Sequence, residues 1–147
     1  MGRFSFRLQP LLNIKEQIEE QKEIEYGRAL RKLEEERTIM AKMLSQRDEL
    51  IQAFRASLSD MINPADIRGY NNCLERLKQM IKEQRRRIEA AEVFAEKKRK
   101  ELMEAMKQRK MMESVRETRL TDHMLNEKLT EQKQVDELVS YQYSPGV

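Results

Sequence analysis

The sequence predicts an all-α protein in which two long helices fold back on each other as an antiparallel coiled-coil hairpin. Three observations support this fold class. Charged residues make up 37% of the 147 residues and only 4 glycines and 3 prolines interrupt them, a composition typical of coiled coils and long helices. Apolar residues recur at alternating steps of four and three along two long stretches, which is the period of a left-handed coiled coil. One strong break separates the stretches, so the second helix should run back along the first.

The break lies at Ser59–Asp66. Asn63 can cap the second helix, because its side-chain oxygen can accept a hydrogen bond from a free backbone N–H. Pro64 fits the first helical position, where its missing N–H leaves no hydrogen bond unmade. Asp66 stands where a carboxylate can reach back to the cap and meets the positive end of the helix dipole. We therefore expect a turn at about residues 59–64 within a single hairpin formed by residues 1–147.

The first helix is expected at about residues 8–58, with Pro10 in its first turn. Gly27 should weaken it locally, by about 1 kcal/mol relative to alanine. Its seam, the stripe that should face the second helix, consists of Tyr26, Leu30, Leu33, Arg37, Met40, Leu44, Arg47, Ile51, Phe54, Leu58 and Met61.

The second helix is expected at about residues 65–140. Its seam consists of Ile67, Tyr70, Leu74, Leu77, Ile81, Gln84, Ile88, Ala91, Ala95, Lys98, Leu102, Ala105, Arg109 and Met112. At about 1.5 Å per residue this helix is the longer one, and the start of the first helix should lie opposite about residue 116. About 20 residues then have no partner within the chain, and such a helix either frays or is held by another protein. Tyr141–Val147 should form a frayed tail.

Charge and composition limit the kind of protein. The formal net charge is +3, with 29 basic and 26 acidic residues interleaved, which suits an acidic protein partner but is weak evidence for nucleic acid. The single cysteine excludes an internal disulfide and fits a reducing compartment. No apolar run is long enough to span a bilayer, and Met1–Phe6 lacks the apolar segment of a signal peptide. We therefore expect a cytosolic protein.

No arrangement of residues predicts catalysis, so we expect neither an enzyme nor a cofactor, a metal ion or a small-molecule substrate. His123 is the only histidine and lies on a polar helix, where it is expected to be solvated rather than a ligand. Cys73 is expected to be a small residue near the contact between the helices, because a redox or metal role needs companion residues. Two helices alone also offer no deep pocket for a substrate.

Three surface features each have two interpretations. Phe4–Leu12 is either packing against the second helix or an exposed docking patch. Arg85–Arg87 and Lys97–Lys100 are either solvated or in contact with an acidic protein, because successive helical residues point in different directions and nearby glutamates dilute the charge. The methionine-rich stretch is either flexible seam packing or an adaptable binding surface. It consists of Met103, Met106, Met111 and Met112.

Three segments, in their order and spacing, resemble the bacterial flagellar export protein FliJ family: Phe4–Leu12, Tyr70–Leu77 and Glu131–Leu138. The resemblance implies a hairpin similar to the central stalk subunit of rotary ATPases. It implies a non-enzymatic part of the flagellar type III export apparatus, one that binds the hexameric export ATPase, links it to the export gate membrane protein and escorts export chaperones. It also implies a protein that is cytoplasmic, monomeric when isolated, and peripherally associated with the inner face of the cell membrane at the flagellar base.

The resemblance further implies two binding ends. The ATPase-binding end comprises Phe4, Phe6, Leu8, Gln132, Lys133, Asp136 and Glu137. The gate-binding end comprises Phe54, Tyr70, Cys73, Leu77, Met80 and Gln84. Cys73 stands where some relatives carry an aromatic residue, and the chaperone contact has no assigned position.

Other functions stay open at this point. The pattern also fits the stalk protein of a virulence type III secretion system, which genomic neighbours would distinguish. It fits a structural scaffold that forms parallel dimers or filaments, which light scattering would reveal. A nucleic-acid-binding protein is a further alternative, and its affinity would fall steeply with salt.

Overall fold

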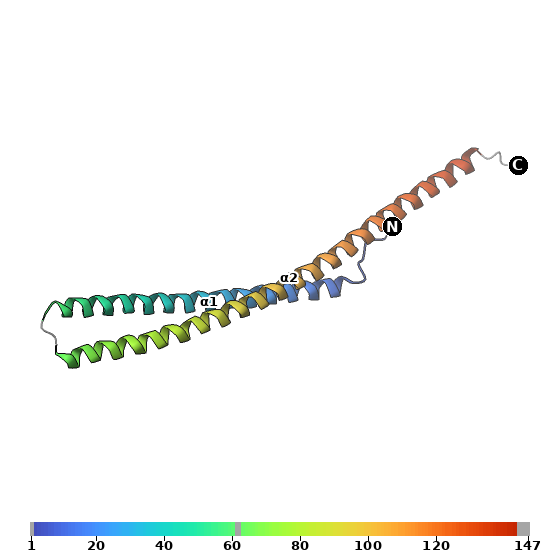
Figure 1. Ribbon diagram of the computed structural model, residues 1–147. Coiled ribbons are helices and arrows are strands. Elements are labelled where there is room, and N and C mark those ends of the chain that lie inside the picture. The colour runs from blue at the N-terminus through green and yellow to red at the C-terminus, as the bar shows by residue number, and fades with distance from the viewer. Residues whose placement is uncertain (1, 61–62, 144–147) are drawn as a thin grey trace. The chain divides into compact units, whose positions relative to one another are not determined.

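The protein consists of two long helices, α1 (Gln9–Leu58) and α2 (Pro64–Tyr143), in a computed structural model (Figure 1). The structure describes residues 2–60 and 63–143, and these residues form no β-strand. The predicted all-α class, with two long helices packed antiparallel, is confirmed. Met61 and Ile62 of the expected turn and residues 144–147 of the expected tail lie outside the described residues, whereas residues 141–143 of that tail belong to α2.

The start of α2 is capped as the sequence predicts. The backbone N–H of Ala65 donates a hydrogen bond to Asn63 Oδ1 at 3.2 Å, and the backbone N–H of Asp66 donates to the Asn63 carbonyl oxygen at 2.9 Å. Pro64 occupies the first helical position, and Asp66 is the acidic residue of the first turn. At the end of α1, Ser59 Oγ donates to the carbonyl oxygen of Ala56 at 2.6 Å. Local side-chain chemistry therefore defines where α1 stops and α2 begins.

The chain forms two compact units. The turn unit comprises residues 22–102, so the end of α1 packs there against the beginning of α2. The terminal unit comprises residues up to 21 together with residues from 103 on. The antiparallel direction follows from the contacts within each unit. These contacts are Lys22–Glu101 and Glu36–Gln84 in the turn unit, and Gln9–Arg116 and Glu19–Arg109 in the terminal unit.

The core of the turn unit is a small apolar cluster on the facing sides of the helices. Met40, Leu77 and Ile81 are each at most 9% exposed, and Leu44 and Ile88 are among the half-buried side chains that pack around them. Fully burying such a side chain contributes about 1.5–3 kcal/mol. Two helices cover each other on one side only, so the unit gains its stability in increments along the seam.

The seam of α2 agrees with the sequence prediction, whereas that of α1 is partly different. Every predicted α2 seam residue is buried or half-buried. On α1 the prediction is wrong for Leu30, Arg37 and Leu58, which are exposed, and for Leu30 this amounts to 44% exposure. Ala29 and Glu36 occupy the seam instead, at 3% and 5% exposure. The predicted position Met61 lies outside the described residues.

A rotation of α1 about its own axis explains this difference. Positions one residue apart differ by about 100° around a helix, so a small rotation replaces one side chain by its neighbour in the seam. Glu36 is tolerated there because Gln84 donates two hydrogen bonds to it, one to the backbone carbonyl oxygen at 2.8 Å and one to a carboxylate oxygen. The bond to the carboxylate, with an ion pair from Lys32 at 3.0 Å, lowers the pKa of Glu36.

Ion pairs flank the seam in both units. Lys22, Glu25, Lys98 and Glu101 form a network across the turn unit with N–O distances of 3.2–3.5 Å. The Lys98 ammonium lowers the pKa of Glu101, and the Glu101 carboxylate raises the pKa of Lys98. In the terminal unit Arg109 pairs with the buried Glu19 carboxylate, which is the main reason why the pKa of Arg109 is raised. Such networks connect the helices without requiring a thicker apolar core.

The N-terminal segment, residues 2–8, precedes α1 and packs against α2 in the terminal unit. Phe6 is 7% exposed, and the Arg119 guanidinium lies 5.7 Å from its ring. The Phe4 ring lies 5.6 Å from the His123 ring and 5.7 Å from the Arg116 guanidinium. The packing interpretation of this apolar segment therefore holds for Phe6. The segment also covers α2 several residues beyond the expected limit near residue 116.

Candidate functional site

The described residues form no metal centre. Within residues 2–60 and 63–143 there is no cluster of three or more histidine, cysteine or acidic residues that could hold a metal ion. His123 was expected to be solvated, but it is half-buried, with Nε2 3.2 Å from the Gly2 carbonyl oxygen and 3.3 Å from Glu127 Oε1. Among the described helices, neither has a stretch that is both long and apolar enough to cross a membrane.

The two basic runs are partly neutralised by neighbouring acids. Arg99 donates to Glu96 at 2.7 and 2.9 Å, which raises the pKa of Arg99 and lowers the pKa of Glu96. Lys98 is engaged with Glu25 and Glu101 in the network across the turn unit. Arg85–Arg87 are exposed throughout, whereas Lys98 and Arg99 of the second run are half-buried, so the solvated interpretation fits the first run better than the second.

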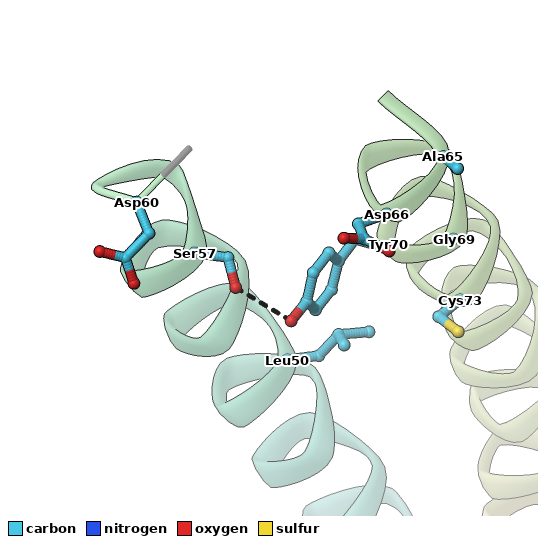
Figure 2. Close-up of a pocket in the computed structure, with 8 residues that line it drawn as sticks. All are labelled: Leu50, Ser57, Asp60, Ala65, Asp66, Gly69, Tyr70 and Cys73. Atoms are coloured by element: carbon cyan, nitrogen blue, oxygen red, sulfur yellow. Dashed lines mark hydrogen bonds between the residues drawn. The ribbon is translucent and has the colours of Figure 1, made fainter. Parts of the chain in front are cut away.

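An aromatic contact near the end of α1 connects the two helices in the turn unit. The rings of Phe54 and Tyr70 meet edge to face, with centroids 5.3 Å apart. The Tyr70 hydroxyl lies 3.1 Å from Ser57 Oγ on α1, as Figure 2 shows. Both rings are half-buried, so each has one side against the partner helix and another side toward solvent. Such amphipathic side chains are common at binding surfaces.

Beside this contact lies the turn groove, two adjoining hollows between α1 and α2. The first has a volume of about 520 Å³ and includes Leu50, Tyr70 and Cys73 in its lining (Figure 2). The second has a volume of about 490 Å³ and shares Leu50 and Cys73, and its lining also includes Leu77 and Met80. Because both hollows share two lining residues, they form one surface in the turn unit.

Small side chains on α2 leave space in the turn groove. Ala65, Gly69 and Cys73 follow each other at four-residue steps and line the first hollow. At Gly69 no atom lies within 4 Å of the place where a Cβ would stand, so the chain itself does not need a glycine there. Cys73 was expected near the contact between the helices, and the structure places it exposed at the side of the groove. Its companion on α1 is Leu50, which also lines both hollows.

The structure brings together five of the six residues assigned to the gate-binding end. Phe54 touches Tyr70, and Tyr70, Cys73, Leu77 and Met80 line the turn groove. Gln84 is different, because it is 2% exposed and its amide is bonded to Glu36. The sequence interpretation missed the α1 wall of the groove, formed by Gln46, Glu49, Leu50 and Ser57. A seam drawn through Ala29 and Glu36 in steps of seven would have reached Leu50 and Ser57.

The residues assigned to the ATPase-binding end fall into two separate groups on the terminal unit. Phe4, Phe6 and Leu8 belong to the N-terminal segment, where Phe6 is buried and the other two are half-buried. The second group is exposed on α2 and consists of Gln132, Lys133, Asp136 and Glu137. At about 1.5 Å per residue, Gln132 lies roughly 14 Å along α2 from His123, where Phe4 packs. The two groups therefore do not form one compact patch.

The last part of α2 carries the distal stripe, an apolar stripe that nothing covers among the described residues. All side chains from Lys128 to Tyr143 are exposed. The stripe consists of Met124, Leu125, Leu129, Val135, Leu138 and Val139, which are 45–64% exposed. At about 100° per residue these six side chains spread over roughly half of the helix circumference, on one side, together with Gln132. Lys133 and Glu137 lie on the opposite, polar side.

Comparison with known proteins gives one family and one related fold. A family model described as "Flagellar FliJ protein" matches residues 4–146. The curated proteins yield no match. Among solved structures, the putative YscO homolog CT670 from Chlamydia trachomatis is 21% identical, with 96% of each chain covered and a TM-score of 0.75. At this identity the similarity shows a shared fold.

Proposed function

Because the chain belongs to the flagellar FliJ protein family, we propose that it is the stalk or adaptor of a flagellar type III export apparatus. In this proposal it binds the export ATPase ring with the end of α2 and the export gate with the turn groove, and it has no enzymatic activity of its own. It works in the cytoplasm, peripherally associated with the membrane at the flagellar base, and also escorts export chaperones.

The observation that carries this proposal is the distal stripe. Helices of this kind are marginally stable alone in water, and most of their stability in proteins comes from packing an apolar face. Here six apolar side chains remain exposed on one face of α2. A protein partner that covers them, such as the interior of the ATPase ring, would supply the missing packing. Gln132 lies within the stripe, and Asp136 lies at its edge, so both would contact that partner.

The N-terminal residues have a different part in this proposal. Phe6 is buried against Arg119, so it holds the N-terminal segment on α2 rather than reaching a partner. Phe4 and Leu8 remain half-buried and would contribute at the rim of the ATPase contact.

The ATPase contact is tested by removing the distal stripe without shortening the helix. Leu129→Gln/Val139→Gln replaces two stripe residues by a good helix former, and Asn126→Gln/Thr130→Gln introduces the same residue at two exposed positions on the polar side. The first variant should lose most of its stimulation of the export ATPase from the same cell, while the control should stimulate normally. Equal stimulation by both variants would count against the ATPase contact.

The gate contact is tested at Gly69. Gly69→Gln should fill the turn groove, and it should stabilise the helix by up to about 1 kcal/mol because the space is open and the backbone is helical. Gly27→Gln is the matched control, since that position is also helical, open and within the turn unit. We expect only Gly69→Gln to lose binding to the cytoplasmic region of the gate. Normal binding by Gly69→Gln would exclude the groove as the gate site.

A second candidate is the corresponding stalk of a virulence secretion system, which is favoured by the fold shared with a putative YscO homolog. Deleting the gene distinguishes the two. Loss of motility with intact effector secretion supports the flagellar assignment, and the reverse result supports the virulence assignment. If light scattering found a dimer and cross-linking showed that its chains run parallel, neither stalk would stand and the chain would be a scaffold.

A further inference from the structure

The methionine-rich part of α2 forms a surface that neither binding end uses. A shallow hollow of about 500 Å³ in the terminal unit is lined by Met103, Met106, Lys107, Lys110, Met111 and Ser114. All six residues come from α2, and their spacing of three, four, seven and eight places them on one side of the helix. We name this the methionine–lysine surface.

This surface faces away from α1. Met103 and Met111 are 53% and 55% exposed, whereas Ala105, a seam residue between them, is 7% exposed. Met112 is half-buried in the seam. The sequence left two interpretations of these methionines, seam packing and binding, and in the structure the four methionines take two different positions. Met112 belongs to the seam, while the other three line the exposed hollow.

The lysines of the surface differ from the other cations nearby. Arg109 points to the seam and pairs with Glu19 and Glu113. Lys107 and Lys110 are exposed, and neither has an ion pair with any residue that the structure describes. Three thioether side chains are therefore accompanied by two lysines that form no ion pair among the described residues.

We propose that the methionine–lysine surface binds an acidic amphipathic helix of a partner protein, laid along α2 as a third helix. Met103 to Ser114 extends over roughly 16 Å, or about three helical turns, which is a suitable length for a short helical segment. Flexible methionine side chains adapt to apolar residues of varied shape. Carboxylates on the flanks of such a helix would complement Lys107 and Lys110.

The chemistry of the surface favours a protein helix over other partners. Nucleic acid recognition uses aromatic side chains for base stacking, and the hollow has none. Stable attachment to a membrane uses larger basic clusters with aromatic or leucine side chains. This inference does not rest on the proposed stalk function, because the surface lies outside both the distal stripe and the turn groove.

The test uses the full chain and a defined probe. The probe is a fluorescent peptide of about 18 residues with leucines at steps of three and four and glutamates at the other positions, and a second peptide has lysines in place of the glutamates. Fluorescence anisotropy measures binding to the wild type, to Lys107→Glu/Lys110→Glu and to Met103→Gln/Met111→Gln. Lys78→Glu/Lys82→Glu is the control, with the same charge change at two exposed positions elsewhere on α2.

We expect saturable binding of the acidic peptide, weakened about tenfold or more by each surface variant and unchanged in the control. Any binding of the lysine peptide should be the same for the wild type and for the two surface variants. The proposal is overturned if the acidic peptide does not saturate, or if the surface variants bind it as the wild type does. It is also overturned if the variants instead lose binding to vesicles of phosphatidylglycerol, because the surface would then serve a membrane.

Discussion

At the proposed gate end, Leu77 and Met80 are expected to differ in their contribution to stability. Leu77 is 9% exposed in the apolar cluster with Met40 and Ile81, whereas Met80, three residues later, is 45% exposed. Leu77→Ala removes the equivalent of three buried carbon atoms, each worth about 0.8 kcal/mol. Allowing for its slight exposure and for partial collapse of the seam, we expect a loss of about 2–3 kcal/mol in the free energy of unfolding.

Thermal unfolding followed by circular dichroism measures this loss. For a chain of this size, about 2–3 kcal/mol corresponds to a fall in Tm of about 5–10 °C. Met80→Ala, which removes an exposed side chain, should shift the free energy of unfolding by at most about 0.5 kcal/mol. If Leu77→Ala melted within a degree of the wild type while Met80→Ala was strongly destabilised, the seam described here would be wrong.

Three further predictions follow from local contacts. Asn63→Ala should lower the free energy of unfolding by about 1 kcal/mol through loss of the α2 cap, as measured by urea titration, and no change would contradict the capping bond. Gln84→Leu should lower the Tm because the buried Glu36 carboxylate then keeps only its ion pair with Lys32, and adding Glu36→Leu should raise the Tm again because both polar groups of the seam are then gone. Because the folded protein lowers the pKa of Glu36, its contribution to stability is complete above the ordinary carboxyl pKa of about 4.3 and is lost as the pH falls below it. Melts between pH 7 and pH 3 should show this loss, and Gln84→Leu should reduce it.

The turn groove and the distal stripe differ in how much of each can be predicted from the sequence alone. The distal stripe can be recognised in the sequence, because apolar residues continue along the part of the second helix that the shorter first helix cannot cover. The gate-end residues were found through a resemblance of Tyr70–Leu77 to a known family. The α1 wall of the turn groove, including Leu50, was missed because two neighbouring stripes of α1 are almost equally apolar. Gln84 was predicted in the α2 seam, but its hydrogen bonds to Glu36, which remove it from the gate-binding surface, were missed because they depend on a residue across the seam.

The sequence by itself determined the two helices, the break between them and the α2 seam from Ile67 to Met112. Helix formation and capping depend on residues within about four positions of each other, so the local sequence is enough to predict the helices and their ends. Only the tertiary structure decided the rotation of α1, which buries Ala29 and Glu36 and leaves Leu30 exposed. That choice depends on which side chains fit across the seam, where Gln84 provides the hydrogen bonds that make a buried carboxylate acceptable.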